Sequence, residues 1–470
     1  MSKSVAAMLA LLFVAALCIL AVKPAFSSAD DSAENTWVSK APMHVARSGL
    51  GVAVVNGKIY AIGGHAEDGY LGTNEEYDPA TDTWTYKKPM PTPRGRFGIA
   101  VYKNKIYCIG GDVAGGYFSN DSITVVNEVY DPATDTWETK TPIPTLRRGV
   151  GANVVNGKIY LIGGIVPYDP SSTGFSHLSL NEVYDPETDS WSTRAEMPTA
   201  VISSRSAVID SKIYIITGGS NQIYDAGTDT WSSGTPRPVS SIGGVARIEA
   251  ATGVNALKRI YFFGGGKTQV YDPEADRWTV GADMPSGRSD FSIGVVDDLL
   301  YVLGGYTSAY EDFPDDWIYG PQITRYTTNE RYTPFGYGAP DPSYDGVAPV
   351  IRIESPANQT YYTADAGLNV TEIALNFTAD ETVFSTRYML DGEIPVEISG
   401  NTTIAGLAVG VHNVTVSAFD ASGNFGVSEP VFFTIAEPEP FPTTLVAAVS
   451  GTSVALIGVA LLVYFKKRKR

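Results

Sequence analysis

Four arginines recur at one position of the sequence and together suit the binding of an acidic ligand. A guanidinium group can form two parallel hydrogen bonds to a carboxylate, so a ring of such groups would hold a ligand that carries carboxylates. The alternative is that each arginine pairs with an acid or with carbonyl groups of a neighbouring structural unit. Each lies 11 residues before the residue that opens an apolar segment, and the four are Arg47, Arg94, Arg147 and Arg288.

Aromatic side chains gather among acidic residues in the polar stretches between the apolar segments. Exposed rings beside carboxylates and amides suit stacking on the faces of sugars or gripping a peptide. The alternative is that these long loops fold on themselves and use the rings as small cores of their own. The pattern predicts ligand contacts by Tyr70, Tyr117, Tyr168, Tyr306, Tyr310 and Trp317.

Residues for metal binding or covalent chemistry are sparse. The chain has four His and two Cys, and Cys108 lies where related segments carry aliphatic residues, so we expect it in a core. His65 and His177 stand on separate loops, which makes a poor metal site. Carboxylates such as Glu67 and Glu311 are present, but nothing marks an acid–base pair. The sequence therefore favours a protein without catalytic residues, metal or cofactor.

One sequence motif, "NGKIYAIGG", recurs along the chain with small changes, and its copies define the strands that must position these residues. Within a unit, "GVAVV" and "KIYAI" are apolar runs joined by a tight "NG" turn, and "NEEYDP" is a third strand ended by proline. "ATDT" then leads to a fourth strand that begins with tryptophan. Repetition of this unit predicts four-stranded antiparallel sheets arranged around an axis. The six copies lie at residues 56–64, 104–111, 156–164, 212–219, 259–265 and 299–305.

Aromatic residues recur at two fixed positions of the copies, and we expect them to pack one sheet against the next. The second strands carry Tyr60, Tyr107, Tyr160, Tyr214, Tyr261 and Tyr301. The third strands carry Tyr77, Tyr130, Tyr184, Tyr224, Tyr271 and Tyr332.

The tryptophans predict how the ring closes. A tryptophan follows five of the third strands but none follows Tyr332, whereas Trp37 precedes the first unit with nothing before it to pair with. We therefore expect the segment around Trp37 to supply the outer strand of the sixth sheet, which leaves no unpaired seam. The five tryptophans that follow third strands are Trp84, Trp137, Trp191, Trp231 and Trp278.

The Gly-Gly, Tyr-Asp-Pro and spaced Trp pattern, with "PMP..R" before a unit, resembles the kelch repeat. The resemblance implies a six-bladed β-propeller over residues 35–337. Repeat four departs slightly, with "ITGGS" and Asp225-Ala226 in place of Asp-Pro, and repeat five has an inserted first turn. Kelch propellers commonly bind ligands through the face that carries the loops after the second strands. These loops vary most among the copies, as functional loops on a rigid scaffold do. The longest are residues 65–73, 112–126, 165–180 and 306–328.

Some kelch propellers are enzymes, which leaves an enzymatic alternative. A copper-radical oxidase needs a His pair and a Cys–Tyr crosslink, for which this chain lacks the residues. Asp boxes of the sialidase kind are absent too. The strongest enzymatic alternative is a sugar-modifying enzyme like a sialic-acid epimerase, which works by acid–base chemistry.

The two ends of the chain predict a membrane protein. Residues 1–28 have the basic start and apolar run of a signal peptide; an uncleaved anchor is the alternative. Residues 443–465 carry no charge and are long enough to cross a bilayer as a helix. The basic tail at residues 466–470 places that end in the cytoplasm and the rest outside. The formal net charge of −17 argues against a nucleic-acid partner.

Residues 345–436 show short alternating segments that predict a β-sandwich. They look like the Ig-like modules (cadherin-like or fibronectin-like) of prokaryotic surface proteins, and the C-terminal end resembles the tails of archaeal ones. Residues 437–442, "EPEPFP", form a stiff Pro/Glu stalk. Sequons suggest a glycoprotein, with chance in a Thr-rich segment as the alternative. They begin at Asn120, Asn358, Asn369, Asn376, Asn401 and Asn413.

Together these features predict an all-β protein: a six-bladed kelch propeller, an Ig-like β-sandwich and a single C-terminal transmembrane helix. We expect a single-pass cell-membrane protein with most of its chain extracellular, which recognises or adheres to glycan or protein ligands. The alternatives are the sugar-modifying enzyme and a structural component of the cell envelope.

Overall fold

The computed structural model describes residues 33–113, 122–166, 176–201, 206–217, 219–238, 247–309, 322–343, 347–362, 371–420 and 424–437. The chain divides into two compact units. One comprises Met1–Val347 with Ala421–Asn424, and the other comprises Ala348–Asp420 with Phe425–Arg470. Every regular element of the described residues is a β-strand.

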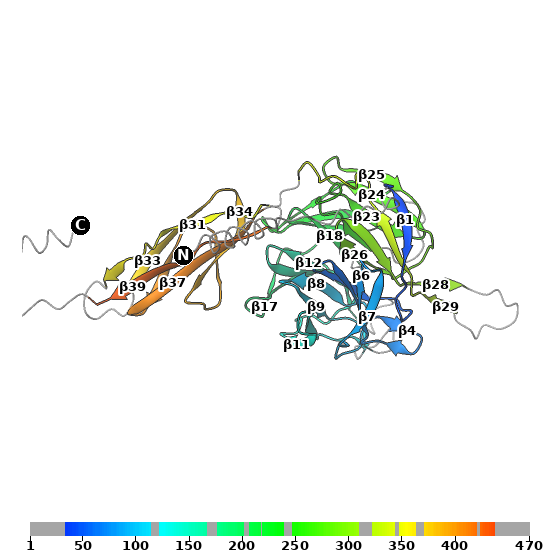
Figure 1. Ribbon diagram of the computed structural model, residues 1–470, viewed down its shortest axis with the longest axis horizontal. Coiled ribbons are helices and arrows are strands. Elements are labelled where there is room, and N and C mark those ends of the chain that lie inside the picture. The colour runs from blue at the N-terminus through cyan, green and yellow to red at the C-terminus, as the bar shows by residue number, and fades with distance from the viewer. Residues whose placement is uncertain are drawn as a thin grey trace, which may run out of the picture. The chain divides into compact units, whose positions relative to one another are not determined.

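The first unit contains six four-stranded antiparallel sheets, as expected for kelch blades (Figure 1). We call each sheet a blade and give its strands from the inside outward. Blade 1 is β2 (Gly51–Val55), β3 (Lys58–Ile62), β6 (Asn74–Asp78) and β7 (Thr83–Lys87). Blade 2 is β8 (Gly98–Tyr102), β9 (Lys105–Ile109), β10 (Asn127–Asp131) and β11 (Thr136–Lys140). Blade 3 is β12 (Gly151–Val155), β13 (Lys158–Ile162), β16 (Asn181–Asp185) and β17 (Ser190–Thr193).

The remaining blades have the same plan. Blade 4 is β18 (Ser206–Ile209), β19 (Lys212–Ile216), β20 (Asn221–Asp225) and β21 (Thr230–Ser233). Blade 5 is β22 (Arg247–Ala250), β23 (Ile260–Gly264), β24 (Lys267–Asp272) and β25 (Arg277–Gly281). Blade 6 is β26 (Ser292–Val296), β27 (Leu299–Leu303), β30 (Asn329–Thr333) and β1 (Thr36–Lys40).

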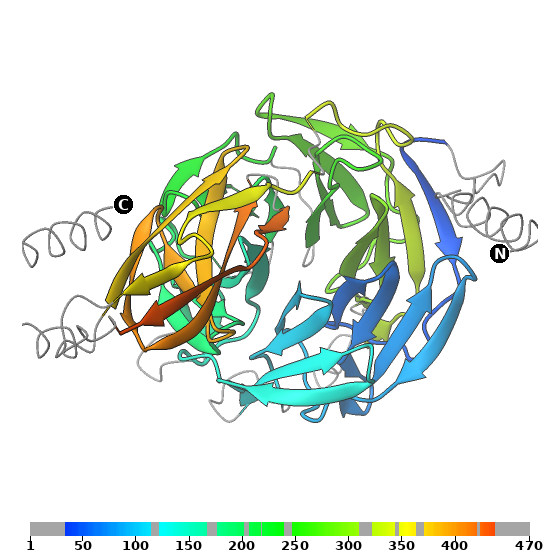
Figure 2. The same ribbon diagram turned by 60° about the vertical axis from the view of Figure 1, so that its left-hand side comes forward.

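The blades follow one another around a ring, which Figure 2 shows more nearly face-on. Each innermost strand contacts the innermost strands of the blades before and after it, and β26 of blade 6 contacts β2 of blade 1. The ring is completed by β1, which pairs antiparallel with β30 and sets Trp37 opposite Tyr332. The outer strand of blade 6 therefore comes from the opposite end of this unit's sequence.

The recurring tyrosines pack one blade against the next, as predicted. Tyr60 of blade 1 lies 5.9 Å, ring centre to ring centre, from Tyr130 of blade 2. The same contact recurs at every blade boundary, and Tyr301 of blade 6 meets Tyr77 of blade 1 at 5.9 Å. Cys108 lies in the apolar core between blades 1 and 2 and is fully buried, as predicted. The other contacts are Tyr107–Tyr184, Tyr160–Tyr224, Tyr214–Tyr271 and Tyr261–Tyr332.

A polar contact joins the blades at their outer edge. The hydroxyl of Tyr77 donates to Oδ1 of Asp82 over 2.6 Å, and the same oxygen accepts from the backbone N–H of Ala41 in the preceding blade at 2.8 Å. Trp84 Nε1 then donates to the carbonyl oxygen of Ala41 over 2.7 Å. The Asp82 backbone has a φ of 53°, in the left-handed region that Asp and Asn tolerate best. Equivalent aspartates accept the tyrosine hydroxyl in four other blades: Asp135, Asp189, Asp229 and Asp276.

The loops after the second strands emerge on one face of the ring, which we call the hairpin face. On this face β4 (His65–Ala66) pairs with β5 (Gly69–Tyr70), and β14 (Ile165–Val166) pairs with β15 (Ser176–His177). Likewise, β28 (Tyr306–Ala309) pairs with β29 (Gln322–Arg325) (Figure 1). The opposite face carries short turns such as Asn56-Gly57.

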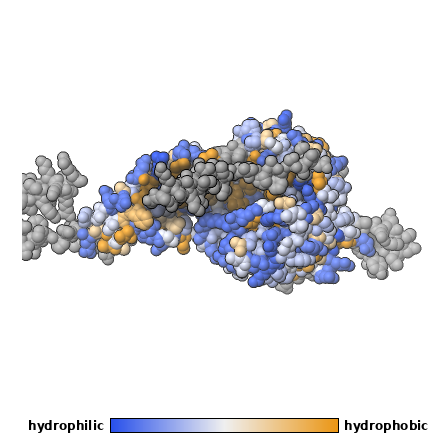
Figure 3. Space-filling model, in the orientation of Figure 1, coloured by the Kyte–Doolittle hydropathy of each residue, from blue (hydrophilic) through white to orange (hydrophobic). Residues whose placement is uncertain are grey.

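The surface of the blades is mostly hydrophilic in the view of Figure 3, with hydrophobic residues scattered among hydrophilic ones. Two of the exposed apolar side chains of this unit, Tyr86 (58% exposed) and Val280 (70% exposed), stand on outer strands. Scattered exposure of this kind is usual for folded proteins. It gives no indication of a broad apolar docking surface on the outer edge.

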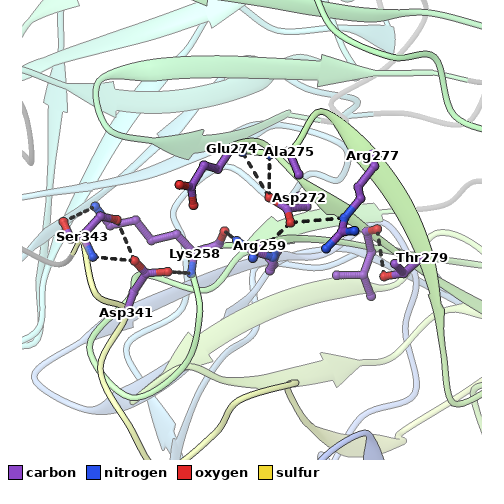
Figure 4. A network of polar contacts seen from close by, with 10 residues as sticks. Lys258, Arg259, Asp272, Glu274, Ala275, Arg277, Thr279, Asp341 and Ser343 are labelled. Atoms are coloured by element: carbon purple, nitrogen blue, oxygen red, sulfur yellow. Dashed lines mark hydrogen bonds and ion pairs between the residues drawn. The ribbon is translucent and has the colours of Figure 1, made fainter.

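The inserted turn of blade 5 holds the segment that leaves the blades (Figure 4). The backbone N–H of Gly338 donates to the carbonyl of Asn255 at 2.8 Å, and Asp341 Oδ2 accepts from the N–H of Lys258 at 2.8 Å. Lys258 Nζ donates to Asp210 Oδ1 of the blade 4 turn at 2.7 Å and to the carbonyl of Ser343 at 3.2 Å. The insertion therefore anchors residues 338–343 to blades 4 and 5.

The second unit consists of two sheets with a shared apolar core. One sheet contains β31 (Ile351–Ser355), β33 (Thr371–Ala379) and β36 (Thr402–Leu407). The other contains β32 (Thr360–Tyr362), β39 (Val431–Ala436), β37 (Gly410–Asp420), β34 (Val383–Leu390) and β35 (Val396–Ile398), with β38 (Phe425–Val427) paired to β37. Leu375 of the first sheet and Val416 of the second are fully buried in one cluster. Two sheets that share a core form a β-sandwich.

Within the described ranges, no helix is long and apolar enough to cross a membrane. The predicted signal peptide, the predicted transmembrane segment at residues 443–465 and the basic tail lie outside those ranges.

Candidate functional site

The four recurring arginines are buried beneath the hairpin face and form ion pairs inside their own blades. Arg147 Nη2 lies 2.7 Å from Glu182 Oε2, and Arg288 Nη1 lies 2.6 Å from Glu330 Oε2. Arg47 pairs with Glu75 over 3.1 Å, and Arg94 pairs with Glu128. All four arginine side chains are 0% exposed.

Each of these arginines also donates to a backbone carbonyl of the second strand of its blade. Arg147 Nη2 donates to Leu161 O over 3.1 Å, and the burial of this side chain lowers the pKa of Arg147 to about 10 although Glu182 opposes the shift. Burial likewise lowers the pKa of Arg47. The geometry corrects two expectations: the partner glutamate belongs to the same blade rather than a neighbouring one, and the guanidinium groups are enclosed by protein instead of facing a ligand.

The blades whose third strand lacks the glutamate use other partners. Gln222 of blade 4 accepts from the backbone N–H of Thr199 at 2.9 Å and donates to its carbonyl at 3.0 Å. Gln269 of blade 5 accepts from Arg237 Nη1 at 2.9 Å. The buried glutamate thus occurs in the blades that carry a repeat arginine, whose charge it stabilises, whereas the buried Arg237 of blade 5 has the neutral Gln269 as its partner.

A second network of charges lies closer to the axis, on the hairpin face. Arg96 Nη1 is 3.3 Å from Asp112 Oδ2, and Arg96 Nη2 is 3.1 Å from Asp290 Oδ2. Arg148 Nη1 is 3.0 Å from Asp112 Oδ1. We call these four side chains the mouth network. The side chain of Arg96 is 29% exposed while that of Asp112 is fully buried, and burial raises the pKa of Asp112 against the opposing effect of Arg148 and Arg96.

The backbone positions the mouth network by a chain of hydrogen bonds from blade to blade. The N–H of Gly49 donates to Asp290 O, that of Arg96 to Gly49 O, and that of Gly149 to Arg96 O, over 2.8 to 2.9 Å. These four residues share a positive φ, between 51° and 62°. Gly is the usual residue for this conformation, so Arg96 and Asp290 depart from the type that the backbone favours.

His65 connects the hairpins of blades 1 and 6. Its Nδ1 lies 2.7 Å from Arg325 Nη2 of β29, and its ring makes an edge contact with Tyr70 at 4.9 Å. Burial, and then the charges of Arg325 and Arg96, lower the pKa of His65. The imidazole is therefore neutral at pH 7, and Nδ1 accepts a hydrogen bond from the guanidinium group.

The predicted aromatic contacts are only partly described. Tyr70 is half-buried, and its ring approaches Gly95 closely enough that a Cβ there would lie 3.3 Å from Tyr70 Cε1. Tyr306 is half-buried where β28 begins. Both are thus at the base of hairpins, partly packed against their surroundings. Outside the described residues lie Tyr117, Tyr168, Tyr310 and Trp317.

The described residues contain no group of three or more His, Cys, Asp or Glu that could hold a metal ion. Burial raises the pKa of the Cys108 thiol to about 12, which leaves it protonated and unreactive at neutral pH. Glu67 is exposed on the first hairpin, and Glu311 lies outside the described residues.

The sequons of the sandwich differ in accessibility. Asn358 and Asn401 are exposed, although Asn401 Oδ1 accepts from the N–H of Phe377 at 2.9 Å. Asn376 and Asn413 are half-buried, and Asn413 Nδ2 donates to Asp391 Oδ1 over 3.4 Å. Asn120 and Asn369 lie outside the described residues.

Sequence reasoning did not identify the mouth network or the contact between His65 and Arg325. One signal for the network was present: Arg96 and Asp290 each follow a repeat arginine by two residues, where the other described copies have Gly49 and Gly149. Nothing in the sequence alone indicated Arg325.

Comparison with known proteins defines the class of protein. Residues 31–164 match the family model described as "KLHDC2/KLHL20/DRC7 Kelch-repeats domain", and residues 146–198 match the "Kelch motif". The chain is therefore a kelch-repeat domain protein, and the kelch resemblance is confirmed over these residues.

Its relatives are distant. It is 30% identical over 184 residues to Kelch-like protein 35 of Mus musculus, covering 39% of this chain and 29% of that protein. It is 28% identical over 203 residues to Kelch-like protein 15 of Danio rerio, covering 40% and 33%. It is 31% identical over 186 residues to Beta-scruin of Limulus polyphemus, covering 39% and 20%. The matches thus span a third or less of each relative.

Proposed function

We propose that the protein is a membrane-anchored surface protein that recognises glycan or protein ligands through the hairpin face of its kelch blades. The observation that carries the proposal is the asymmetry of the two faces. Three hairpins rise from blades 1, 3 and 6 on one face, whereas the other carries short turns apart from the inserted turn of blade 5. Variable loops on a rigid scaffold are where binding residues are most often found.

The chemistry of the hairpin face supports a polar ligand. Arg96 presents part of its guanidinium group between Asp112 and Asp290, and Arg325 lies beside the neutral His65. These fixed donors and acceptors offer hydrogen bonds to hydroxyl, amide or carboxylate groups. The four buried arginines hold the underlying strands and take no part in the proposed contact.

The proposed extracellular location of the blades is inferred from the sequence. A signal peptide at residues 1–28, a single span at residues 443–465 and the basic tail would place the six-bladed propeller and the sandwich outside the cell. In this proposal the sandwich is an Ig-like stalk of prokaryotic surface type, with its sequons as sites of glycosylation.

The test uses the full-length protein in lipid nanodiscs, applied to arrays of glycans and of extracellular proteins. One variant replaces residues 307–324 with a two-residue turn, and a second is Arg96→Met. The control is Lys103→Ala on the opposite face, where the side chain is 55% exposed. We expect saturable binding that the control keeps, that the shortened hairpin loses and that Arg96→Met weakens. Binding that survives both hairpin-face changes would reject this face as the site, and no binding to any array would reject the proposal.

A further inference from the structure

The innermost strands surround a cavity of about 110 Å³ that is partly open to solvent. Its lining includes the apolar residues Val52, Phe97, Val150 and Ile293, but most of the surface that faces the cavity is polar. The polar side chains that line it come from Ser206, Glu249 and Ser292. A carboxylate is therefore placed at the centre of the ring, in a small cavity that is polar over most of its surface.

Glu249 departs from the repeat at its position. In β22 it lies opposite Tyr261, the recurring tyrosine of the second strand. In the other blades the residue opposite that tyrosine is small or uncharged: Ala53, Ala100, Asn153, Ala207 and Gly294. The fold thus does not require an acid here, since blades with the same strand pairing form without one.

Few of the described protein groups stabilise the negative charge of the Glu249 carboxylate. Among the described residues, its hydrogen-bond partner is the backbone N–H of Ala250, which donates to Oε1 over 3.1 Å. Burial raises the pKa of Glu249 to about 7, and this N–H is the opposing influence. An ion in such surroundings is costly unless an opposite charge joins it.

The elements packed against β22 bring few other titratable groups. The adjoining strand β23 contributes the buried Tyr261, and the neighbouring innermost strands β18 and β26 contain no titratable residue. On β22 itself the sequence contains one other charged residue, Arg247. Glu249 is therefore the acid available to a cation in the cavity.

We propose that this cavity binds a small organic ammonium ion, whose charged group pairs with Glu249 and whose short apolar body contacts the apolar part of the lining. An ammonium group supplies three donors and a positive charge. The apolar body gains by leaving water, as any aliphatic group does on burial. This inference does not depend on the proposed function of the hairpin face.

The size and lining of the cavity favour an ammonium ion over a metal ion. Ca²⁺ takes six to eight oxygen ligands, whereas the side-chain oxygens here are one carboxylate and two hydroxyls. Pockets for drug-sized molecules are about 300–1,000 Å³, so this cavity suits a ligand of only a few heavy atoms.

The experiment measures the binding of n-propylammonium chloride to the purified full-length protein by isothermal titration calorimetry. The uncharged comparison ligand is n-propanol. Glu249→Gln removes the charge with little change of shape, and Glu274→Gln is the matched control because Glu274 is exposed on the outer turn of the same blade. We expect one bound propylammonium per chain, weaker by about tenfold or more in Glu249→Gln and unchanged in Glu274→Gln.

A pH series on the unsubstituted protein gives a second, independent readout. Because the ammonium group pairs with the ionised carboxylate, its affinity should rise as pH increases from about 5.5 to about 8. Equal binding of n-propanol, equal binding by Glu249→Gln, no binding of propylammonium, or an affinity that does not change with pH would each overturn the proposal. If Glu249→Gln does not fold, the pH series still decides.

Discussion

Tyr332 donates its hydroxyl hydrogen bond to Oδ1 of Asn35 over 2.7 Å, although 297 positions separate the two residues in the chain. Asn35 also accepts from the backbone N–H of Ala282, and Trp37 Nε1 donates to the carbonyl of Ala282 over 2.9 Å. Asn35 thus takes the place that Asp82 and its equivalents occupy in the other blades. Its φ of 56° matches theirs.

Asn35→Gly should therefore destabilise the ring, because it removes the acceptor without adding strain at a positive φ. The buried hydroxyl of Tyr332 and the N–H of Ala282 would each lose a partner, and we expect a loss of about 1–3 kcal/mol in the free energy of unfolding. Urea unfolding measures it. Asn35→Asp introduces the aspartate that the other blades have at this position, and this variant should retain most of the stability. Equal stability of Asn35→Gly and the unsubstituted chain would contradict this role.

Arg147→Met should be strongly destabilising, because it leaves Glu182 buried without its counter-charge. Loss of one partner of a buried ion pair costs about 3–5 kcal/mol. The double variant Arg147→Met/Glu182→Gln should recover much of that loss, since blade 4 has Gln222 at the same place. Denaturant unfolding tests both variants. The control is Lys267→Met, which breaks an exposed pair with Asp283 and should cost less than about 1 kcal/mol. A loss for Arg147→Met as small as that of the control would refute the structural role.

Glu249→Gln should stabilise the protein at high pH but not at low pH. The pKa of Glu249 is raised in the folded state from 4.5 to about 7, so the folded state holds a proton that the unfolded state releases. Stability therefore falls as pH rises through this window, and the full cost, up to about 3 kcal/mol, is present above it. The free energy of unfolding, measured at about pH 5 and about pH 8, should be higher for Glu249→Gln than for the unsubstituted protein only at the higher pH. An equal gain at both values would exclude titration of Glu249 as the cause.

Asp341→Ala should free the segment that leaves the blades. Asp341 accepts from the N–H of Lys258, and its other oxygen accepts from the N–H and hydroxyl of Ser343. Although burial acts in the opposite direction, hydrogen bonds from Ser343 and Lys258 lower the pKa of Asp341. Limited proteolysis should cut the variant faster between residues 338 and 349. Asp283→Ala, at an exposed pair, serves as the control, and equal cutting rates would show that the contact is dispensable.

The periodic part of the fold could be predicted from the sequence because each blade repeats the same strand chemistry. The recurrence of Tyr60 and Tyr77 at fixed positions of the repeat predicted that they pack against neighbouring blades, as they do. The apolar residues at the position of Cys108 in the other copies predicted that it lies in a core, where it is found. The lack of a tryptophan after Tyr332 pointed to Trp37, and β1 is found paired with β30. The Asn35-Thr36-Trp37 spacing, which copies Asp82-Thr83-Trp84, could have identified Asn35 as well.

The polar sites were harder to predict, because periodicity locates a residue along a strand without showing what surrounds its side chain. The arginines were placed correctly near the start of the innermost strands, but their burial depends on glutamates of another strand of the blade, such as Glu128, which lies 34 residues after Arg94. The presence of Gln222 and Gln269 where other copies have Glu was the available clue. Arg96 and Asp112 belong to blade 2, where Gly95 pairs with Asp112, but Asp290 comes from blade 6 and Arg148 from blade 3, and no local pattern encodes their meeting.

The position of β1 also sets the order in which the chain can become complete during its synthesis. β1 is made before any blade, whereas its partner β30 follows after all the intervening strands. Until then β1 lacks its partner strand, and its open edge could pair with another chain. Closure is a long-range step of the slow kind that non-local strand pairing imposes. A chain whose synthesis stops before β30 therefore keeps β1 unpaired at the edge of an incomplete ring.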